Sequence, residues 1–315
     1  MSDETAATGE RLVPDAQHGE LVHAEHVARY LVAAGLASDR RVLDVACGEG
    51  YGTDMLARAG AQAAVGVDID EATIERAAER YAGTFQRADV AELPFEDGSF
   101  DLVVSFETIE HVGDAKAALS ELQRVLAPDG LLLISTPNSS EYLVDNEFHV
   151  REFSHDEFEV LLKGRFPSVR LLYQHNWLLS AVVGERALRE GSAAQALDID
   201  VRKTAALEPG GELYTLALCG ERTDVALSQV GVAAGTDEAH QLARRLVDAE
   251  ETVRLWHGEY EQAAETAQKW HDVYKETERR ADEAVAVARW MRGSLSWRIT
   301  KPLRLPAKLR ERRDR

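Results

Sequence analysis

The sequence contains little cysteine and no long apolar run. Its two cysteines, Cys47 and Cys219, are too few for a disulfide framework and too far apart for a metal-binding cysteine pattern, which favours a reducing compartment. No apolar stretch approaches the roughly 18 to 20 residues of a membrane-spanning helix, and the acidic N-terminus lacks the apolar core of a signal peptide. We therefore expect a cytoplasmic protein without a membrane span.

Basic residues are also scarce relative to acidic ones. The chain has 36 Lys and Arg against 55 Asp and Glu, and its net charge of -19 disfavours nucleic acid as a partner. Apolar residues at 45% and charged residues at 29% are typical of a soluble globular protein. Because 315 residues exceed the roughly 100 to 200 of one ordinary domain, we expect a catalytic domain with an appendage.

Between residues 41 and 222, short β-branched runs alternate with longer amphipathic stretches. This alternation predicts an α/β fold with a doubly wound, seven-stranded, mostly parallel sheet. The expected strands cover 41–46, 63–68, 84–88, 101–106, 130–136, 168–175 and 212–219. The expected helices cover 21–34, 51–59, 71–82 and 114–126, the last stopped by Pro128 and Gly130, and a further helix begins at Ser154.

The composition changes beyond this region. We expect a catalytic domain over 1–223, a small-residue linker over 224–237 and a coiled coil over 238–292. From Leu242 to Leu295, apolar or small residues recur four and three positions apart, with Thr277 as the one polar member of the row. Such spacing is typical of left-handed coiled coils and predicts self-association, as dimer or trimer. The alternative is a long helix that folds back on its own domain.

The last segment, 293–315, reverses the charge of the chain. Basic residues from Arg292 onwards outnumber Glu311 and Asp314, and apolar residues such as Trp297 lie between them. This mixture predicts a tail that lies against an anionic membrane surface, at the inner face of the plasma membrane. The alternative is a solvated tail.

A glycine turn follows the first expected strand. Gly48 and Gly50 allow the backbone to approach a ligand closely, and Asp44 precedes them. Asp68 closes the next strand, where its carboxylate can accept hydrogen bonds from two ribose hydroxyls, and Asp89 follows the third strand, within reach of an adenine amino group. The sequence pattern of a nicotinamide dinucleotide site has glycine at the position of Thr53. The acidic residues around this loop instead favour a positively charged ligand.

These residues, together with the segments 93–104 and 126–135, resemble the class I S-adenosylmethionine-dependent methyltransferases. The resemblance implies a Rossmann-like fold with strand order 3-2-1-4-5-7-6, an antiparallel last strand and S-adenosylmethionine as cofactor. The cofactor contacts that it implies come from three strand ends: Asp44, Gly48 and Gly50 for the methionine part, Asp68 and Ile69 for ribose and adenine, and Asp89 and Val90 for the adenine edge.

Two further groups of residues are candidates for catalysis. On one helical turn Glu107, Glu110 and His111 would share a face and could hold a divalent ion such as Mg²⁺, as in the similar E-x-x-E-H string of ubiquinone-biosynthesis O-methyltransferases. His111 could instead act as a general base without metal, or the string could serve packing. His149, in a loop after the fifth strand, could accept the proton or fasten its loop.

Pieces at 8–14, 25–30 and 294–304 look like those of bacterial surface-polysaccharide methyltransferases, including O-antigen methyltransferases with a coiled coil. The resemblance implies an O-methyltransferase that acts on a sugar hydroxyl of a cell-surface glycan or its lipid-linked precursor. Two alternatives remain: methylation of a small molecule such as a quinone or polyketide, and a scaffold with a degenerate methyltransferase domain.

Overall fold

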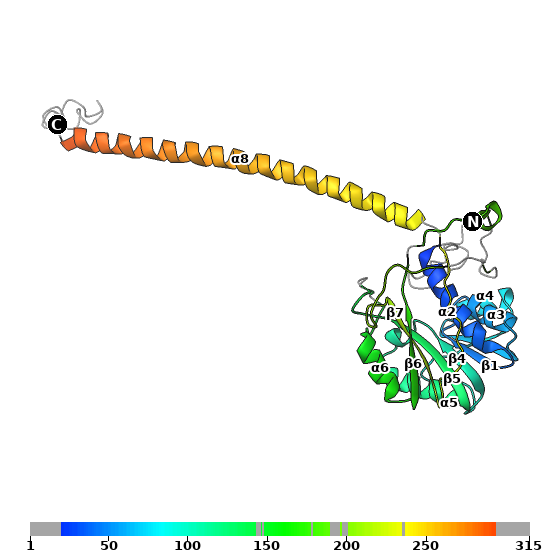
Figure 1. Cartoon of the computed structure of the whole chain (residues 1–315). Helices are drawn as coiled ribbons and strands as arrows, with labels where there is room; N and C mark the ends of the chain where they lie inside the picture. The colour runs from blue at the N-terminus through cyan, green and yellow to red at the C-terminus, as the bar shows by residue number, and fades with distance from the viewer. Residues whose placement is uncertain are drawn as a thin grey trace, which may run out of the picture. The chain divides into compact units, whose positions relative to one another are not determined.

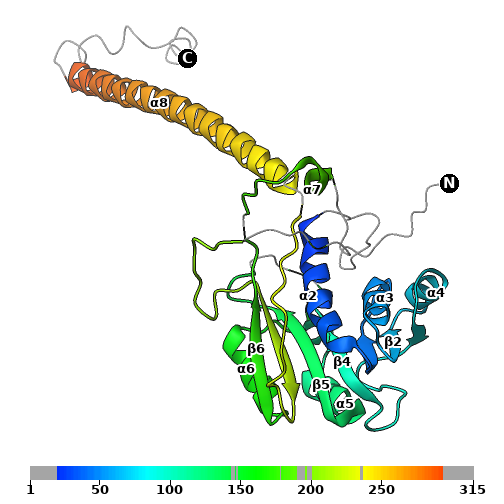
Figure 2. The ribbon, with the colours of Figure 1, turned by 45° about the vertical axis from the view of Figure 1, so that its right-hand side comes forward.

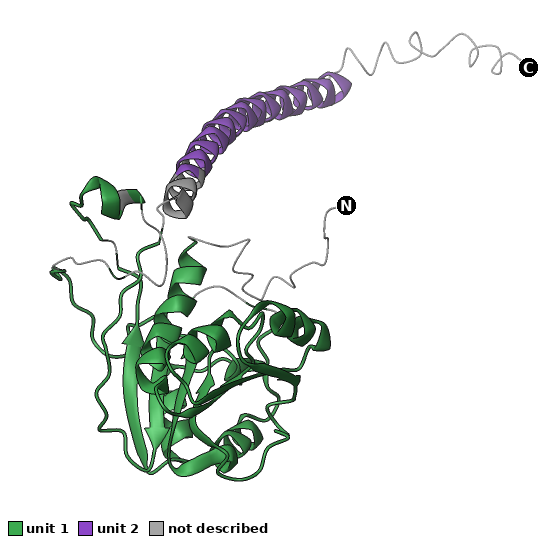
Figure 3. Cartoon of the chain, turned by 90° about the vertical axis from the view of Figure 1, so that its right-hand side faces the viewer, with its two compact units in different colours: residues 1–238 green, residues 239–315 purple. Residues whose placement is uncertain are grey.

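A computed structural model describes residues 20–142, 146, 148–177, 179–189, 196, 201–234 and 237–293. The chain forms two compact units, residues 1–238 and 239–315, shown in green and purple in Figure 3. The N-terminal piece 8–14 and all but the first residue of the predicted tail lie outside the described residues.

Unit 1 is built on one seven-stranded sheet in the order β3-β2-β1-β4-β5-β7-β6. Neighbours from β3 to β5 are parallel, whereas β7 runs antiparallel to both β5 and β6. The strands, of which β1, β4, β5, β6 and β7 are labelled in Figure 1, are β1 (Arg41–Val45), β2 (Ala63–Asp68), β3 (Thr84–Arg87), β4 (Phe100–Ser105), β5 (Leu126–Pro137), β6 (Ser168–Gln174) and β7 (Tyr214–Gly220).

Helices connect these strands, and several begin at residues whose side chains cap free backbone N–H groups. Asp70, Asp114 and Ser154 each accept hydrogen bonds from the first turn of the helix that follows them. The helices are α2 (Leu21–Ala37), α3 (Tyr51–Arg58), α4 (Glu71–Arg80), the 3₁₀ turn η1 (Ile109–His111), α5 (Ala115–Val125), α6 (His155–Lys163), α7 (Glu185–Arg189) and α8 (Asp237–Gly293).

The central strands are buried on both faces, so their sequences are almost continuously apolar. Alternate side chains of each strand enter different cores: Leu43 and Val103 join the cluster with α5 and α6, whereas Val42 and Leu102 join the cluster with α2 and α3. Figure 2 shows α2 alongside α3, against which it packs. This arrangement leaves the carboxyl ends of β1, β2, β4 and β5 at one edge, where open α/β sheets bind ligands.

The predicted fold class and strand order are confirmed. The end of α5 agrees with its prediction to within one residue, because the helix ends at Val125 with Leu126 as C-cap, but the start of β5 was predicted wrongly. The strand begins at Leu126, which pairs with Phe100 in the β4–β5 ladder, and Pro128 and Gly130 lie within β5, where the register shifts. A bulge absorbs the proline, which cannot donate to a regular ladder.

The described part of unit 2 is formed by the helix α8, which spans 57 residues. The aromatic side chains of the seam, Trp256, Tyr260, Trp270 and Tyr274, are each more than 60% exposed in the single chain. Their 4-3 spacing lies on this helix, and pairing with a second copy remains a prediction. Within the described part of the chain, no helix combines the length and the apolar character that crossing a bilayer requires.

Candidate cofactor and acceptor site

The loop between β1 and α3 holds the backbone in unusual conformations. Ala46, Gly48 and Gly50 have φ angles of 61°, 53° and 86°. For Ala46 this left-handed conformation costs about 1 kcal/mol, a strain that clusters at functional sites. A Cβ atom on Gly50 would lie 2.7 Å from Cβ of Ala77, whereas one on Gly48 would meet no atom within 4 Å. Gly50 therefore permits packing, and Gly48 faces open space in which a ligand can lie.

Asp68 joins the end of β2 to this loop. Its Oδ2 accepts a hydrogen bond from the amide of Gly48 at 3.1 Å, and its Oδ1 accepts one from the amide of Asp70 at 3.0 Å. The side chain is 6% exposed. The carboxylate thus lies at the end of β2, next to the open side of Gly48, where it can accept hydrogen bonds from the hydroxyl groups of a ligand.

Asp44 lies beneath the loop and is 1% exposed. Thr53 donates its hydroxyl to Oδ2 at 2.7 Å, and Tyr30 donates its hydroxyl to Oδ1 at 3.1 Å. Burial raises the pKa of Asp44 to about 7, although both hydroxyl groups act in the opposite direction. The carboxyl group therefore changes its charge near neutral pH.

The other residues predicted to hold the cofactor surround the ends of β2 and β3. Ile69 is 58% exposed, which is unusual for a large apolar side chain next to a buried strand and suits contact with a flat ring. Asp89 is exposed, and its Oδ1 accepts from the amide of Ala91. Val90 is partly buried against the core. All of the predicted cofactor residues thus lie in or just after β1, β2 and β3.

Glu107 occupies the end of β4 in a left-handed conformation with a φ of 49°. Ser135 donates to its Oε1 at 2.7 Å, and a guanidinium nitrogen of Arg29 lies 3.6 Å from the same oxygen. The expectation that Glu107, Glu110 and His111 share one helical face was not met. The turn η1 begins only at Ile109, so the side chain of Glu107 leaves the backbone in another direction, towards α2 and β5.

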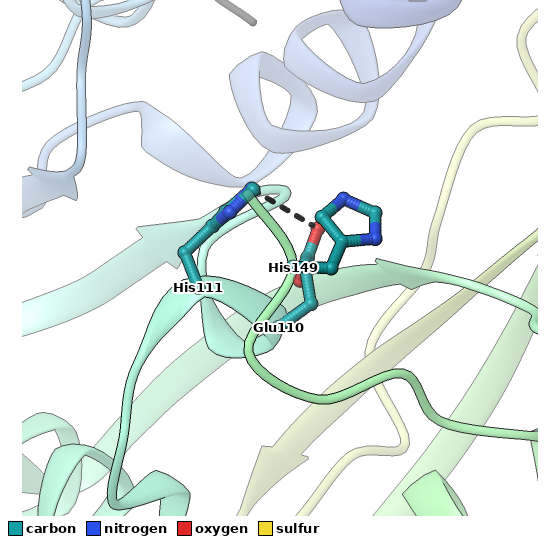
Figure 4. Close-up of side chains that lie close together, drawn as sticks. All are labelled: Glu110, His111 and His149. Carbon is teal, nitrogen blue, oxygen red and sulfur yellow. Dashed lines mark ion pairs between the residues drawn. The ribbon is translucent and has the colours of Figure 1, made fainter. Parts of the chain in front are cut away.

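Glu110, His111 and His149 lie together instead, and one ligand atom from each falls within 4.8 Å of the others (Figure 4). Glu110 is 1% exposed, and its Oε2 accepts from the hydroxyl of Thr136 at 3.0 Å. Its Oε1 is buried, makes no hydrogen bond to any described residue and lies 4.0 Å from Nε2 of His111. Burial, with the nearby charge of Glu107, raises the pKa of the Glu110 carboxyl well above its usual value.

The loop that carries His149 is fixed to η1 by main-chain bonds. The amides of Val150 and Arg151 both donate to the carbonyl oxygen of Glu110, at 2.9 and 3.1 Å. The amides of Val150 and Arg151 thus fix the loop to η1, the ring of His149 lies in the cluster, and its role as proton acceptor remains a prediction. Glu110, Thr136 and His149 line a small crevice with Tyr142 and Glu152, beside the end of β5.

Three important residues were not predicted as site residues: Arg29, Tyr30 and Thr53. Arg29 is 1% exposed, and two of its guanidinium nitrogens make no hydrogen bond to the described residues. A Cβ on Gly52 would lie 2.0 Å from Cζ of Tyr30, so a side chain at position 52 would block the path by which Tyr30 reaches Asp44. The available signal was a charged side chain, Arg29, among the apolar residues of the buried face of α2.

Comparison with known proteins agrees with this geometry. Residues 43–134, which run from β1 into β5, match the family described as methyltransferase domain. The chain contains a class I methyltransferase domain. A Mycolicibacterium smegmatis protein named as a probable S-adenosylmethionine-dependent methyltransferase is 38% identical over 162 residues, which are 50% of this chain and 63% of that protein.

Two further methyltransferases show similarity of different extent. Tocopherol O-methyltransferase of Arabidopsis thaliana is 38% identical over 104 residues, 31% of this chain and 30% of that enzyme. A solved S-adenosylmethionine-dependent methyltransferase from Thermotoga maritima is 18% identical with a TM-score of 0.47, covering 62% of this chain and 89% of that one. The match covers less than two thirds of the length of both curated relatives, the Mycolicibacterium smegmatis protein and tocopherol O-methyltransferase.

The residues present fit S-adenosylmethionine, the cofactor that the domain implies. Its carboxylate suits the buried guanidinium of Arg29, two nitrogens of which make no hydrogen bond to the described residues. Its ribose hydroxyls suit the carboxylate of Asp68, and its positive charges suit the acidic surroundings of Asp44 and Asp68. The open side of Gly48 provides the space. The methyltransferase domain thus offers a complementary group for each polar part of this cofactor.

Proposed function

We propose that the protein is an S-adenosylmethionine-dependent O-methyltransferase that methylates a sugar hydroxyl of a cell-surface glycan or of its lipid-linked precursor. One observation carries the proposal of methyl transfer: the ends of β1 and β2 hold the cofactor residues, and the ends of the adjacent β4 and β5 bring acid and imidazole groups to the same edge. The glycan is supported by the sequence pieces that resemble polysaccharide methyltransferases.

The cofactor, when bound, supplies a methyl group that is attached to a positively charged sulfur. On transfer the sulfur is the leaving group: it keeps the electron pair of the broken bond and becomes a neutral thioether. The chain therefore needs mainly to align an acceptor oxygen and to draw away its proton. Arg29 and Asp68 orient the cofactor, while Glu110, His111 and His149 bind and activate the hydroxyl. Burial of Glu110 excludes water from one side of the acceptor.

A small-molecule acceptor is the second candidate, because a relative is named tocopherol O-methyltransferase. Transfer of a labelled methyl group to glycans, lipid-linked sugars, quinols and phenols, compared side by side, tests the substrate class. Methylation of glycans or lipid-linked sugars alone would support the proposal, and activity only on quinols or phenols would contradict it. The scaffold alternative predicts that the chain does not bind the cofactor. The presence of the complete set of expected cofactor residues argues against this alternative: Asp44, Gly48, Gly50 and Asp68.

We also propose that α8 pairs with a second copy of itself and that the segment 293–315 holds the protein at an anionic membrane surface. The 4-3 spacing of the seam supports the first statement, and the basic and apolar mixture of the tail supports the second. Flotation of the full chain with vesicles that contain acidic lipid, but not with neutral vesicles, is the expected result. Equal flotation with both kinds of vesicle would contradict an electrostatic contact.

A further inference from the structure

The cluster at the acceptor side has an unsatisfied acceptor at its centre. Oε1 of Glu110 is buried and makes no hydrogen bond to the described residues, although Oε2 of the same carboxylate does. A buried oxygen without a donor costs about 1 to 3 kcal/mol, and more when it is charged. Such an atom calls for a positive partner, and this one points towards two imidazoles (Figure 4).

The hydrogen bonds of the two imidazoles place a lone pair on Nε2 of each ring. Nδ1 of His111 lies 3.1 Å from the carbonyl oxygen of Phe148, so Nδ1 carries the hydrogen and donates it. Nδ1 of His149 lies 3.3 Å from Oε1 of Glu152, and the Asn146 amide donates to Nε2 at 2.9 Å. In metal sites a ligating histidine likewise donates its other ring N–H to a carbonyl or carboxylate.

The set of donors, two imidazole nitrogens and one carboxylate oxygen, selects among metal ions. Mg²⁺ prefers oxygen ligands throughout, whereas Zn²⁺, Fe²⁺, Mn²⁺ and Co²⁺ accept imidazole. Glu107, the third oxygen donor expected from the sequence, is held by Ser135 and Arg29. Three protein ligands would leave coordination positions open, as in catalytic rather than structural zinc sites.

The geometry points to a binding site for one divalent transition-metal ion, of the Zn²⁺ type, formed by Glu110, His111 and His149. The ion replaces the hydrogen bond from Asn146 to Nε2 of His149 and gives the orphan oxygen of Glu110 a cationic partner. Glu152 orients the ring of His149, and the carbonyl oxygen of Phe148 orients the ring of His111, in both cases through Nδ1. Ion binding itself requires neither cofactor nor acceptor; only its role in transfer rests on the proposed function.

That role follows from ordinary metal chemistry. The acceptor hydroxyl binds at an open position, which lowers the pKa of its O–H group so that the proton passes to water. The alkoxide oxygen then forms a bond to the methyl carbon as the carbon–sulfur bond breaks, with the electron pair of that bond remaining on sulfur. Positive charge on the sulfonium is thereby neutralised and no oxidant or reductant is needed.

Binding is tested on the full chain, freed of any purification tag and stripped of metal with a chelator. Calorimetric titration with Zn²⁺ and Co²⁺ should show one ion per chain, and Co²⁺ should produce the visible absorption bands of a site with nitrogen ligands. Glu110→Gln and His149→Ala should each weaken Zn²⁺ binding by at least about 100-fold, more than the loss of an outer partner typically costs. Mg²⁺ should bind far more weakly.

Two control variants sharpen the result. Glu107→Gln should weaken Zn²⁺ binding far less than Glu110→Gln does, because Glu107 faces Ser135 and Arg29 and acts on the ion only through its charge, and His271→Ala, which removes an exposed histidine of α8, should have no effect. Because Glu110 is buried, its substitution can unfold the protein, so thermal denaturation of each metal-free variant is used to establish that the variant is folded. If Glu110→Gln is unfolded, Zn²⁺ binding by His149→Ala decides the question. Unchanged Zn²⁺ binding in folded His149→Ala, or dependence on Glu107 instead, would overturn the site.

Failure of this inference is distinguishable from failure of the proposed function. S-adenosylmethionine affinity is measured on the metal-free protein, where it should depend on Arg29, Asp44 and Asp68 and not on His149. If the chain binds the cofactor and methylates its acceptor in the presence of a chelator, the metal ion has no role in methyl transfer. A chain that binds Zn²⁺ through His149 but transfers no methyl group retains the metal site and loses the proposed activity.

Discussion

The hydroxyl of Tyr30 donates a hydrogen bond to Oδ1 of Asp44 across 3.1 Å, within a region closed to solvent. This bond joins α2 to the strand beneath the glycine loop, and it passes beside Gly52, where any side chain would collide with the tyrosine ring. The position of α2 and the charge of the cofactor site are therefore connected through one buried carboxyl group.

Cofactor affinity should rise with pH through neutrality. The pKa of Asp44 is raised to about 7, mainly by burial, so the carboxyl is mostly neutral at pH 6 and mostly ionised at pH 8. An ionised Asp44 attracts the cationic cofactor, and if only this form binds, affinity increases up to about tenfold over that range. Calorimetric titration at a series of pH values measures it. Asp44→Asn should flatten the profile, and an equally steep profile in that variant would assign the effect to another group.

Removing the hydroxyl of Tyr30 should move this profile to higher pH. The hydrogen bond from Tyr30 stabilises the ionised carboxyl and lowers its pKa, so Tyr30→Phe should raise the midpoint by about half a unit to one unit. Tyr173→Phe, which changes a half-exposed tyrosine of β6, is the matched control and should leave the midpoint unchanged. A midpoint that moves downward in Tyr30→Phe would contradict the assignment.

Asp68→Asn should weaken S-adenosylmethionine binding roughly 10- to 100-fold, since it weakens charge-assisted hydrogen bonds to the ribose and to the Gly48 amide. Asp129→Asn, an exposed aspartate within β5, should have no effect. The measurement is calorimetric titration of each variant. Equal affinity in both variants would remove Asp68 from the cofactor site.

The pair formed by Arg29 and Glu107 should show strong coupling in stability. Arg29→Met leaves the carboxylate of Glu107, whose side chain is 17% exposed, without its cationic partner, and should cost about 3 kcal/mol of unfolding free energy. Adding Glu107→Gln removes the stranded charge and should restore at least half of that loss. Urea denaturation of both single variants and the double variant measures the coupling, and simple additivity would show that the pair is independent.

Self-association of α8 should depend on the seam and not on exposed tryptophan in general. Trp270 lies on the seam and is 69% exposed in the single chain, whereas Trp290 lies outside the seam and is 74% exposed. Trp270→Glu should dissociate the oligomer, and Trp290→Glu should leave it intact, because only seam residues enter the partner helix. Sedimentation equilibrium of the full chain distinguishes the two. Equal behaviour of both variants would argue against a coiled coil.

Much of the sheet could be predicted because parallel strands buried on both faces have nearly continuous apolar sequences. All seven strands lie within a few residues of their expected positions, and Asp70, Asp114 and Ser154 begin their helices by simple capping chemistry. The start of β5 was missed, because Pro128 normally ends regular structure and only the bulge opposite Phe100 shows otherwise.

The site was predictable wherever a residue follows a strand directly, as Asp68 and Gly48 do. It was not predictable where backbone conformation or distant packing decides the outcome. The left-handed φ of Glu107 directs its side chain away from Glu110, and a periodicity argument that assumes a regular helix cannot detect this. Arg29 reaches the site only because α2 packs beside β4, a contact between segments far apart in the sequence.

One carbonyl oxygen, that of Glu110, accepts the amides of both Val150 and Arg151. Since main-chain atoms make these bonds, exchanging the side chains at 150 and 151 would leave the separation between the Glu110 carboxylate and the His149 ring intact. Acceptor preference could then diversify through this loop while the spacing of the reactive groups stayed constant.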